Sequence, residues 1–177
     1  MYQSIAEIYA NNDRVRENFR STIDALTDDQ LSILPDGEKW TVTQIVEHMS
    51  LVDEGMVRIC AKLLGKAEAA GKMADGIVTI SDNFAEKGAE IAKIKVQAPD
   101  FVQPVSGASI GESLTRMEGN QKALDDLREK FEHFDGTEFK FPHPFFGDIS
   151  AHEWLALRGG HEARHLKQIK SLAEKIG

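Results

Sequence analysis

Four stretches of the chain repeat apolar residues every three or four positions, the spacing of one face of an α-helix. Each stretch opens on a serine or threonine that is followed three residues later by glutamate or glutamine. This arrangement is the capping-box pattern that marks the start of a helix. The pattern predicts long helices over residues 4–26, 41–64, 109–131 and 150–175.

The segments between these helices differ in length. Residues 66–106 are interrupted by glycine and proline, and we expect in them a short charged helix over 84–96 and a loop over 98–107. An insertion of this length often forms a lid or a pocket wall. Residues 133–149 are rich in aromatic residues and proline, and we interpret them as an irregular connection rather than as strands.

Amphipathic helices of this length bury their apolar faces against one another. We therefore predict an all-α protein with a single domain over residues 1–177, built as a four-helix bundle with an irregular insertion between helices two and three. The long insertion permits a crossover connection, so the helix pattern alone leaves the topology open. Bundle cores commonly host metal sites built from facing helices.

Three histidines lie on apolar helical stripes. His161 and His165 are four residues apart, so they share one face of the last helix, which also carries Trp154 and Ile169. His48 lies in the middle of the stripe of the second helix. Three neutral imidazoles from two helices suit Zn²⁺, Ni²⁺ or another borderline divalent ion, with open positions for water or substrate.

A histidine on an apolar face is also explained as a core residue with its own hydrogen-bond partner, and for any one of the three this is the simpler interpretation. Three inward histidines favour a metal, because without one each ring needs a separate partner. Asn12, Gln121 and Arg158 occupy or border inward stripes as well. They either line a cofactor or substrate pocket, with Arg158 binding a carboxylate, or form ordinary hydrogen bonds in the core.

Other candidates receive a structural interpretation. We expect Cys60 to be a small core residue and His152 to lie at a solvated helix start. His143, between two prolines, either closes over the site or packs within its loop. Glu47 and Glu162 are next to the candidate ligands His48 and His161 in sequence, but they lie on other faces of their helices.

Composition narrows the classes of partner. The net charge is −8, and no lysine and arginine cluster occurs, which argues against nucleic acid or an anionic membrane as the partner. One cysteine excludes an intrachain disulfide and fits a reducing compartment. No run approaches the length of a membrane span, and the N-terminus lacks the pattern of a signal peptide, so we expect a cytoplasmic protein with a small-molecule substrate.

Two segments carry a resemblance to a known family. Residues 40–48, WTVTQIVEH, resemble the second helix of the DinB-like superfamily, in which a histidine at the position of His48 is the first metal ligand. The HPFFG segment at 143–147 and the pattern from Glu153 to Ile169, with His161, His165 and Gln168, resemble the last helix of the same superfamily. The opening helix with residues 26–31 is also similar.

The resemblance implies up-down-down-up connectivity, a zinc or nickel ion on the residues that match His48, His161 and His165, and a homodimer. It also implies a range of functions. Some members are thiol S-transferases or isomerases that use a low-molecular-weight thiol as a cosubstrate, and others are described as metal-dependent hydrolases. A non-catalytic metal-binding or ligand-binding bundle, or an interaction protein, are the remaining alternatives.

Overall fold

The computed structural model describes residues 2–94, 96–104 and 107–176. In chain order the elements are α1 (Ile5–Asp24), α2 (Asp28–Ser32), α3 (Val42–Ala69), α4 (Asp82–Ile91), the 3-10 helix η1 (Asp100–Val102), α5 (Ile110–Asp125), α6 (Arg128–His133), β1 (Lys140–His143), β2 (Gly147–Ser150) and α7 (Ala151–Ile176). Among these residues no helix is long and apolar enough to cross a membrane.

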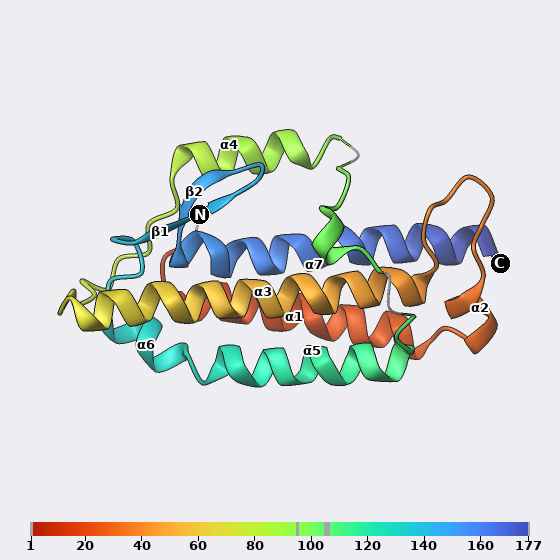
Figure 1. The fold of residues 1–177 in the computed structure, drawn as a ribbon, viewed down its shortest axis with the longest axis horizontal. Helices are drawn as coiled ribbons and strands as arrows, with labels where there is room; N and C mark the ends of the chain where they lie inside the picture. Colours follow the sequence, from red (N-terminus) through yellow and green to blue (C-terminus); the bar gives the residue numbers. More distant parts are fainter. Residues whose placement is uncertain (1, 95, 105–106, 177) are drawn as a thin grey trace.

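The long helices α1, α3, α5 and α7 form a four-helix bundle (Figure 1). The helices α1 and α7 run in one direction, and α3 and α5 run in the other. The main packing pairs are α3 with α5, α1 with α7, and α3 with α7. The predicted bundle and the up-down-down-up connectivity are both confirmed.

The expected helix starts are present with their caps. Thr41 and Gln44 form a reciprocal capping box at α3, as Ser109 and Glu112 do at α5. At α7 the Ser150 amide donates to Glu153 Oε2 at 2.8 Å, and the Glu153 amide donates to Ser150 Oγ at 3.3 Å. These bonds satisfy amides that the first helical turn leaves without intrahelical partners. The third predicted helix is divided, because α5 ends at Asp125 and α6 follows.

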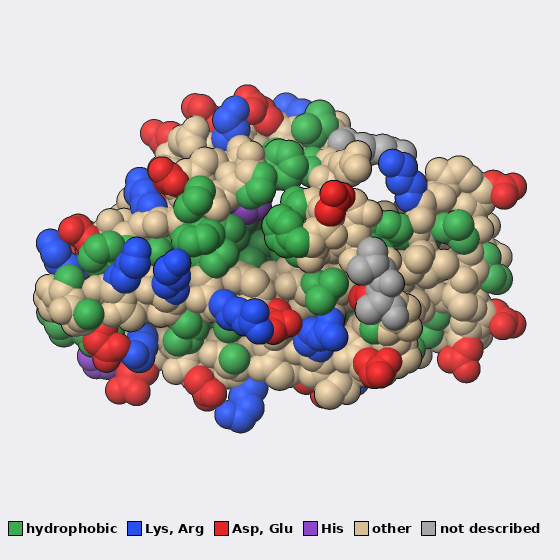
Figure 2. Space-filling view, viewed as in Figure 1, with side chains coloured by type: hydrophobic (Ala, Val, Ile, Leu, Met, Phe, Trp, Pro, Cys, Tyr) green, Lys and Arg blue, Asp and Glu red, His purple; other side chains and the backbone are tan. Residues whose placement is uncertain are grey.

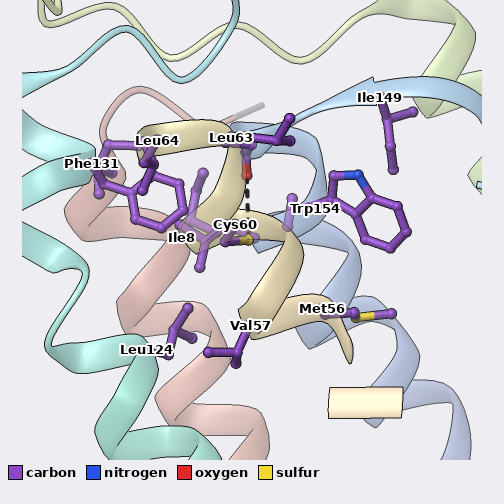
Figure 3. Close-up of a cluster of buried hydrophobic side chains, with 14 of the residues drawn as sticks. Ile8, Met56, Val57, Cys60, Leu63, Leu64, Leu124, Phe131, Ile149 and Trp154 are labelled. Carbon is purple, nitrogen blue, oxygen red and sulfur yellow. Dashed lines mark hydrogen bonds between the residues drawn. The ribbon is translucent and has the colours of Figure 1, made fainter. Parts of the chain in front are cut away.

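The interior has an apolar cluster at each end of the bundle. One contains the first turns of α1 and α7 and the last turns of α3, including the residues labelled in Figure 3: Ile8, Met56, Val57, Cys60, Leu63, Leu64, Leu124, Phe131, Ile149 and Trp154. The other contains Phe19, Ile45, Met117 and Ile169. Cys60 is 1% exposed, so its expected place in the core is confirmed. Some buried polar side chains, among them Asn12, Asp53, Arg158 and Glu162, lie along the long helices between the residues of the two clusters.

The connections differ from the expectation in two places. The insertion contains a helix at Asp82–Ile91 that begins and ends earlier than the predicted 84–96, and residues 95, 105 and 106 lie outside the described part of the chain. The prediction of no strand in 133–149 is wrong, because β1 and β2 form an antiparallel hairpin. Figure 1 shows this hairpin next to α4, where Phe84 stacks on Phe146 with ring centroids 4.9 Å apart. The partner that covers the aromatic hairpin is thus distant in sequence.

Gly159 on α7 marks a close approach to α1. A Cβ there would lie 2.0 Å from Asn12 Oδ1, while Asn12 Nδ2 donates to Leu155 O at 3.0 Å. We expect Gly159→Ala to break this hydrogen bond and to destabilise the protein by about 1–3 kcal/mol in urea denaturation. Gly160→Ala is the matched control, because its Cβ meets nothing within 4 Å. It should stabilise by up to about 1 kcal/mol through helix propensity, and equal effects of both variants would contradict the close approach.

Candidate metal centre

Three histidines converge at the middle of the bundle. His48 comes from α3, and His161 and His165 come from successive turns of α7. One nitrogen from each ring lies within 4.8 Å of the other two. His48 and His165 are buried, while His161 is half-buried. The three rings therefore meet inside the bundle, as the two apolar stripes predicted.

Hydrogen bonds fix the tautomer of two of the rings. His48 Nδ1 lies 2.7 Å from the carbonyl oxygen of Val102, and His165 Nδ1 lies 2.9 Å from Gln168 Oε1. Both partners are acceptors, so each Nδ1 carries the proton and each Nε2 keeps a free lone pair. A metal-binding histidine is commonly oriented by such an acceptor on the ring nitrogen that does not bind the metal.

The separation of the rings suits coordination. His161 Nε2 and His165 Nε2 are 3.2 Å apart. In a tetrahedral zinc site, with Zn–N bonds of about 2.0–2.1 Å, the ligand nitrogens lie about 3.3 Å from each other. The residues present therefore fit a borderline divalent ion.

The three rings are neutral near pH 7. Burial lowers the pKa of His48, and burial together with the neighbouring rings lowers the pKa of His161 well below its usual value. Burial lowers the pKa of His165 to about 4. Neutral imidazoles offer lone pairs to a metal without first losing a proton.

These shifts predict a pH dependence of stability for the metal-free protein. A histidine with a folded pKa below its unfolded value binds more protons in the unfolded chain, so the free energy of unfolding falls as the pH drops below about 6.5. We expect a loss of about 2 kcal/mol from His165 alone between pH 6.5 and pH 5, above the range in which most carboxylates titrate. Urea denaturation at a series of pH values measures this loss. His165→Asn should flatten the curve, and the same slope in both proteins would contradict the assignment.

The insertion between α3 and α5 is attached to the helices that carry the histidines. The Arg164 guanidinium donates to the carbonyls of Ile91 and Ile94, each at 2.8 Å. Glu153 Oε1 accepts from the amide of Ser81 at 3.0 Å, and Val102 O accepts from His48. Ile91, Ile94 and Val102 of the insertion are therefore held close to the site, while Ser81 is held at the start of α7.

Figure 2 shows a hollow between α4, α3 and η1, with a histidine side chain at its floor and a rim of mainly hydrophobic side chains. Trp40 packs against His48 with ring centroids 5.1 Å apart. His143 packs on Trp154 and Phe146, and its Nδ1 accepts from the amides of Phe145 and Phe146 at 3.1 and 3.4 Å. This arrangement agrees with the loop-packing interpretation of His143.

The polar candidates lie deeper in the bundle. Arg158 is 3% exposed and pairs with Asp53, and its Nη2 donates to Gln121 Oε1 at 2.9 Å. Asn12 bonds to the backbone of α7. Each of the three thus has a protein partner, and a role of Arg158, Asn12 and Gln121 in binding a cofactor stays a prediction.

A buried ionic network, which helical periodicity did not predict, lies beside His161. Arg16 Nε lies 2.6 Å from Glu162 Oε1, and Arg16 Nη2 lies 3.3 Å from Asp53 Oδ2. Arg158 contributes a second guanidinium to Asp53, so two arginines face two carboxylates. No spacing signal distinguishes Arg16 or Glu162 from an exposed helix face, whereas Arg158 borders an inward stripe and Asp53 lies on the stripe side of α3.

One further expectation is corrected. His152 is 4% exposed and packs near Phe131, so it does not lie at a solvated helix start. Glu47 and Glu162 are also buried, at 1% and 3% exposed. Tertiary packing at the start and the middle of the bundle buries side chains that a helix considered alone would expose.

The fold and the site together define a four-helix-bundle protein with a three-histidine candidate metal centre. The profile of the DinB superfamily matches residues 11–169. The match spans most of the chain, and the protein belongs to the DinB superfamily.

Two individual proteins are similar to this chain. The uncharacterized protein YuaE of Bacillus subtilis (strain 168) is 27% identical over 159 residues, which cover 85% of this chain and 88% of YuaE. A solved structure described as TT2238, a four-helix bundle protein, has a TM-score of 0.64 at 20% identity and covers 94% of this chain and 98% of its own. This structural similarity supports the fold alone.

Proposed function

We propose that this protein is a metal-dependent enzyme that transfers a low-molecular-weight thiol to a small electrophilic substrate. The observation that carries the proposal is the convergence of three histidines from α3 and α7, with one nitrogen of each ring within 4.8 Å of the other two. A zinc or nickel ion held by His48, His161 and His165 would supply Lewis acidity, which lowers the pKa of a bound thiol and provides a nucleophile at neutral pH.

The protein's own residues supply binding and orientation. The hydrogen bonds to Val102 O and Gln168 Oε1 hold two of the rings with Nε2 toward the common point. The hydrophobic side chains around the hollow of Figure 2 favour an apolar electrophile. In the transfer, a sulfur–carbon bond forms while the bond to a leaving group breaks, and the thiol proton passes to solvent.

The test uses monochlorobimane as the electrophile, with glutathione, cysteine or bacillithiol as the thiol. We expect conjugation above the uncatalysed rate only when protein, divalent ion and thiol are all present. His133→Ala, at an exposed histidine of α6, should keep this rate, and His165→Ala should lose it.

The other outcomes separate the alternatives. Thiol-independent cleavage of an amide substrate, with no conjugation, would replace the proposal with the metal-dependent hydrolase. Metal binding without either reaction would indicate a non-catalytic binding module and would overturn the proposed transferase.

A further inference from the structure

A small pocket lies next to His161. It has a volume of about 10 Å³ and is lined by three methionines and by Arg16, Asp53, Arg158, His161 and Glu162. This volume is at the lower limit for one water molecule. The pocket thus joins the buried ionic network to one member of the candidate metal centre.

Polar groups at this pocket have unused hydrogen-bonding capacity. Arg158 is 3% exposed, and its Nη1 is buried and has no hydrogen-bond partner among the described residues. Within the same part of the chain, Glu162 uses only Oε1, in its bond to Arg16. A buried donor without a partner costs about 1–3 kcal/mol, so a site of this polarity favours a bound water.

His161 differs from the other two histidines. The Nδ1 atoms of His48 and His165 have partners in Val102 O and Gln168 Oε1. For His161 the described residues provide a partner only at Nε2, on the side of His165. If Nε2 is to coordinate a metal, Nδ1 needs an acceptor that fixes the tautomer and the ring plane.

We propose that one water molecule occupies this pocket, accepts hydrogen bonds from Arg158 Nη1 and His161 Nδ1, and donates to Glu162. The inference rests on the proposed metal site in assigning Nε2 of His161 to the ion. The water is the acceptor for Nδ1 of His161, as Val102 O and Gln168 Oε1 are the acceptors for Nδ1 of the other two rings. Arg158 is then a positioning residue, which acts on the metal centre through the water and the His161 ring. The two arginines and two carboxylates around the pocket balance in charge, which favours a neutral water over an ion.

The direct test is a high-resolution crystal structure of the wild-type protein loaded with zinc, because without an ion the 3.2 Å contact to the lone pair of His165 Nε2 would place the proton of His161 on Nε2. We expect one water peak within about 3.2 Å of both Arg158 Nη1 and His161 Nδ1. Nitrogen-15 NMR of the histidine side chains of the zinc-loaded protein should show the proton of His161 on Nδ1. An empty pocket in the zinc-loaded protein, or a His161 Nδ1 bonded to a protein group, would overturn the proposal.

The second test separates a positioning role from a structural one. In Arg158→Lys the ammonium can still pair with Asp53 but lacks the Nη1 donor, and zinc affinity measured by chelator competition should fall about 10-fold to 100-fold. Arg116→Lys is the matched control, because Arg116 contacts Ser50 Oγ and does not line the pocket. Unchanged zinc affinity in folded R158K would overturn the positioning role. If R158K fails to fold, the wild-type water peak and the His161 tautomer decide the proposal.

If the wild-type protein binds neither zinc nor nickel, the proposed metal-dependent function and the positioning role of Arg158 both fail. A crystal structure of the metal-free protein would still establish whether the pocket binds water.

Discussion

His48→Ala is expected to lower the affinity for zinc or nickel by more than about 100-fold, beyond the range seen when only a supporting hydrogen bond to a ligand is lost. His48 is the candidate ligand from α3, so its removal leaves two imidazoles on α7 and no bridge between the helices. His161→Ala and His165→Ala should have similar effects. Metal content after dialysis, measured by inductively coupled plasma mass spectrometry, is expected to fall from one ion per chain to near zero.

The matched control for His48→Ala is His133→Ala, because His133 lies exposed on α6 and is distant in sequence from the three ligands. It should keep one ion per chain. Equal metal content in His48→Ala and the wild-type protein would contradict the three-histidine site. Circular dichroism of each variant distinguishes loss of a ligand from loss of the fold.

Asp53→Ala is expected to destabilise the protein by about 3–5 kcal/mol, the usual cost of removing one partner from a buried ion pair. The Asp53 side chain is 6% exposed and contacts both Arg16 and Arg158. Arg16 keeps Glu162 after the substitution, but Arg158 loses its only carboxylate among the described residues. The free energy of unfolding from urea denaturation measures the effect.

An exposed ion pair provides the control for Asp53→Ala. Glu118 pairs with Arg20 at 2.7 Å, and their side chains are 62% and 44% exposed. Glu118→Ala should change stability by less than about 1 kcal/mol, because solvent screens the pair. If Asp53→Ala were equally mild, the ionic network would not be the buried structure described above.

Helical periodicity predicted the bundle and its inward histidines, because both depend on one face of one helix at a time. The stripes placed His48, His161 and His165 on inner faces, and the capping boxes located the helix starts at Thr41, Ser109 and Ser150. The topology came from the family resemblance, since the helix pattern alone permitted more than one connection.

The ionic network depends on partners from several helices, and periodicity cannot supply these. The network joins Arg16, Asp53, Arg158 and Glu162 from α1, α3 and α7. Periodicity placed Arg158 on or beside an inward stripe but did not identify its partner. The hairpin was missed for a related reason. Its aromatic strands are covered by α4, and nothing within 133–149 indicates this contact.

The most direct test of the metal centre is anomalous diffraction from crystals grown with zinc or nickel, recorded at the absorption edge of the metal. One anomalous peak about 2.0–2.2 Å from Nε2 of His48, His161 and His165 is the predicted result. A peak at other residues, or no peak at these three nitrogens at saturating metal, would contradict the account.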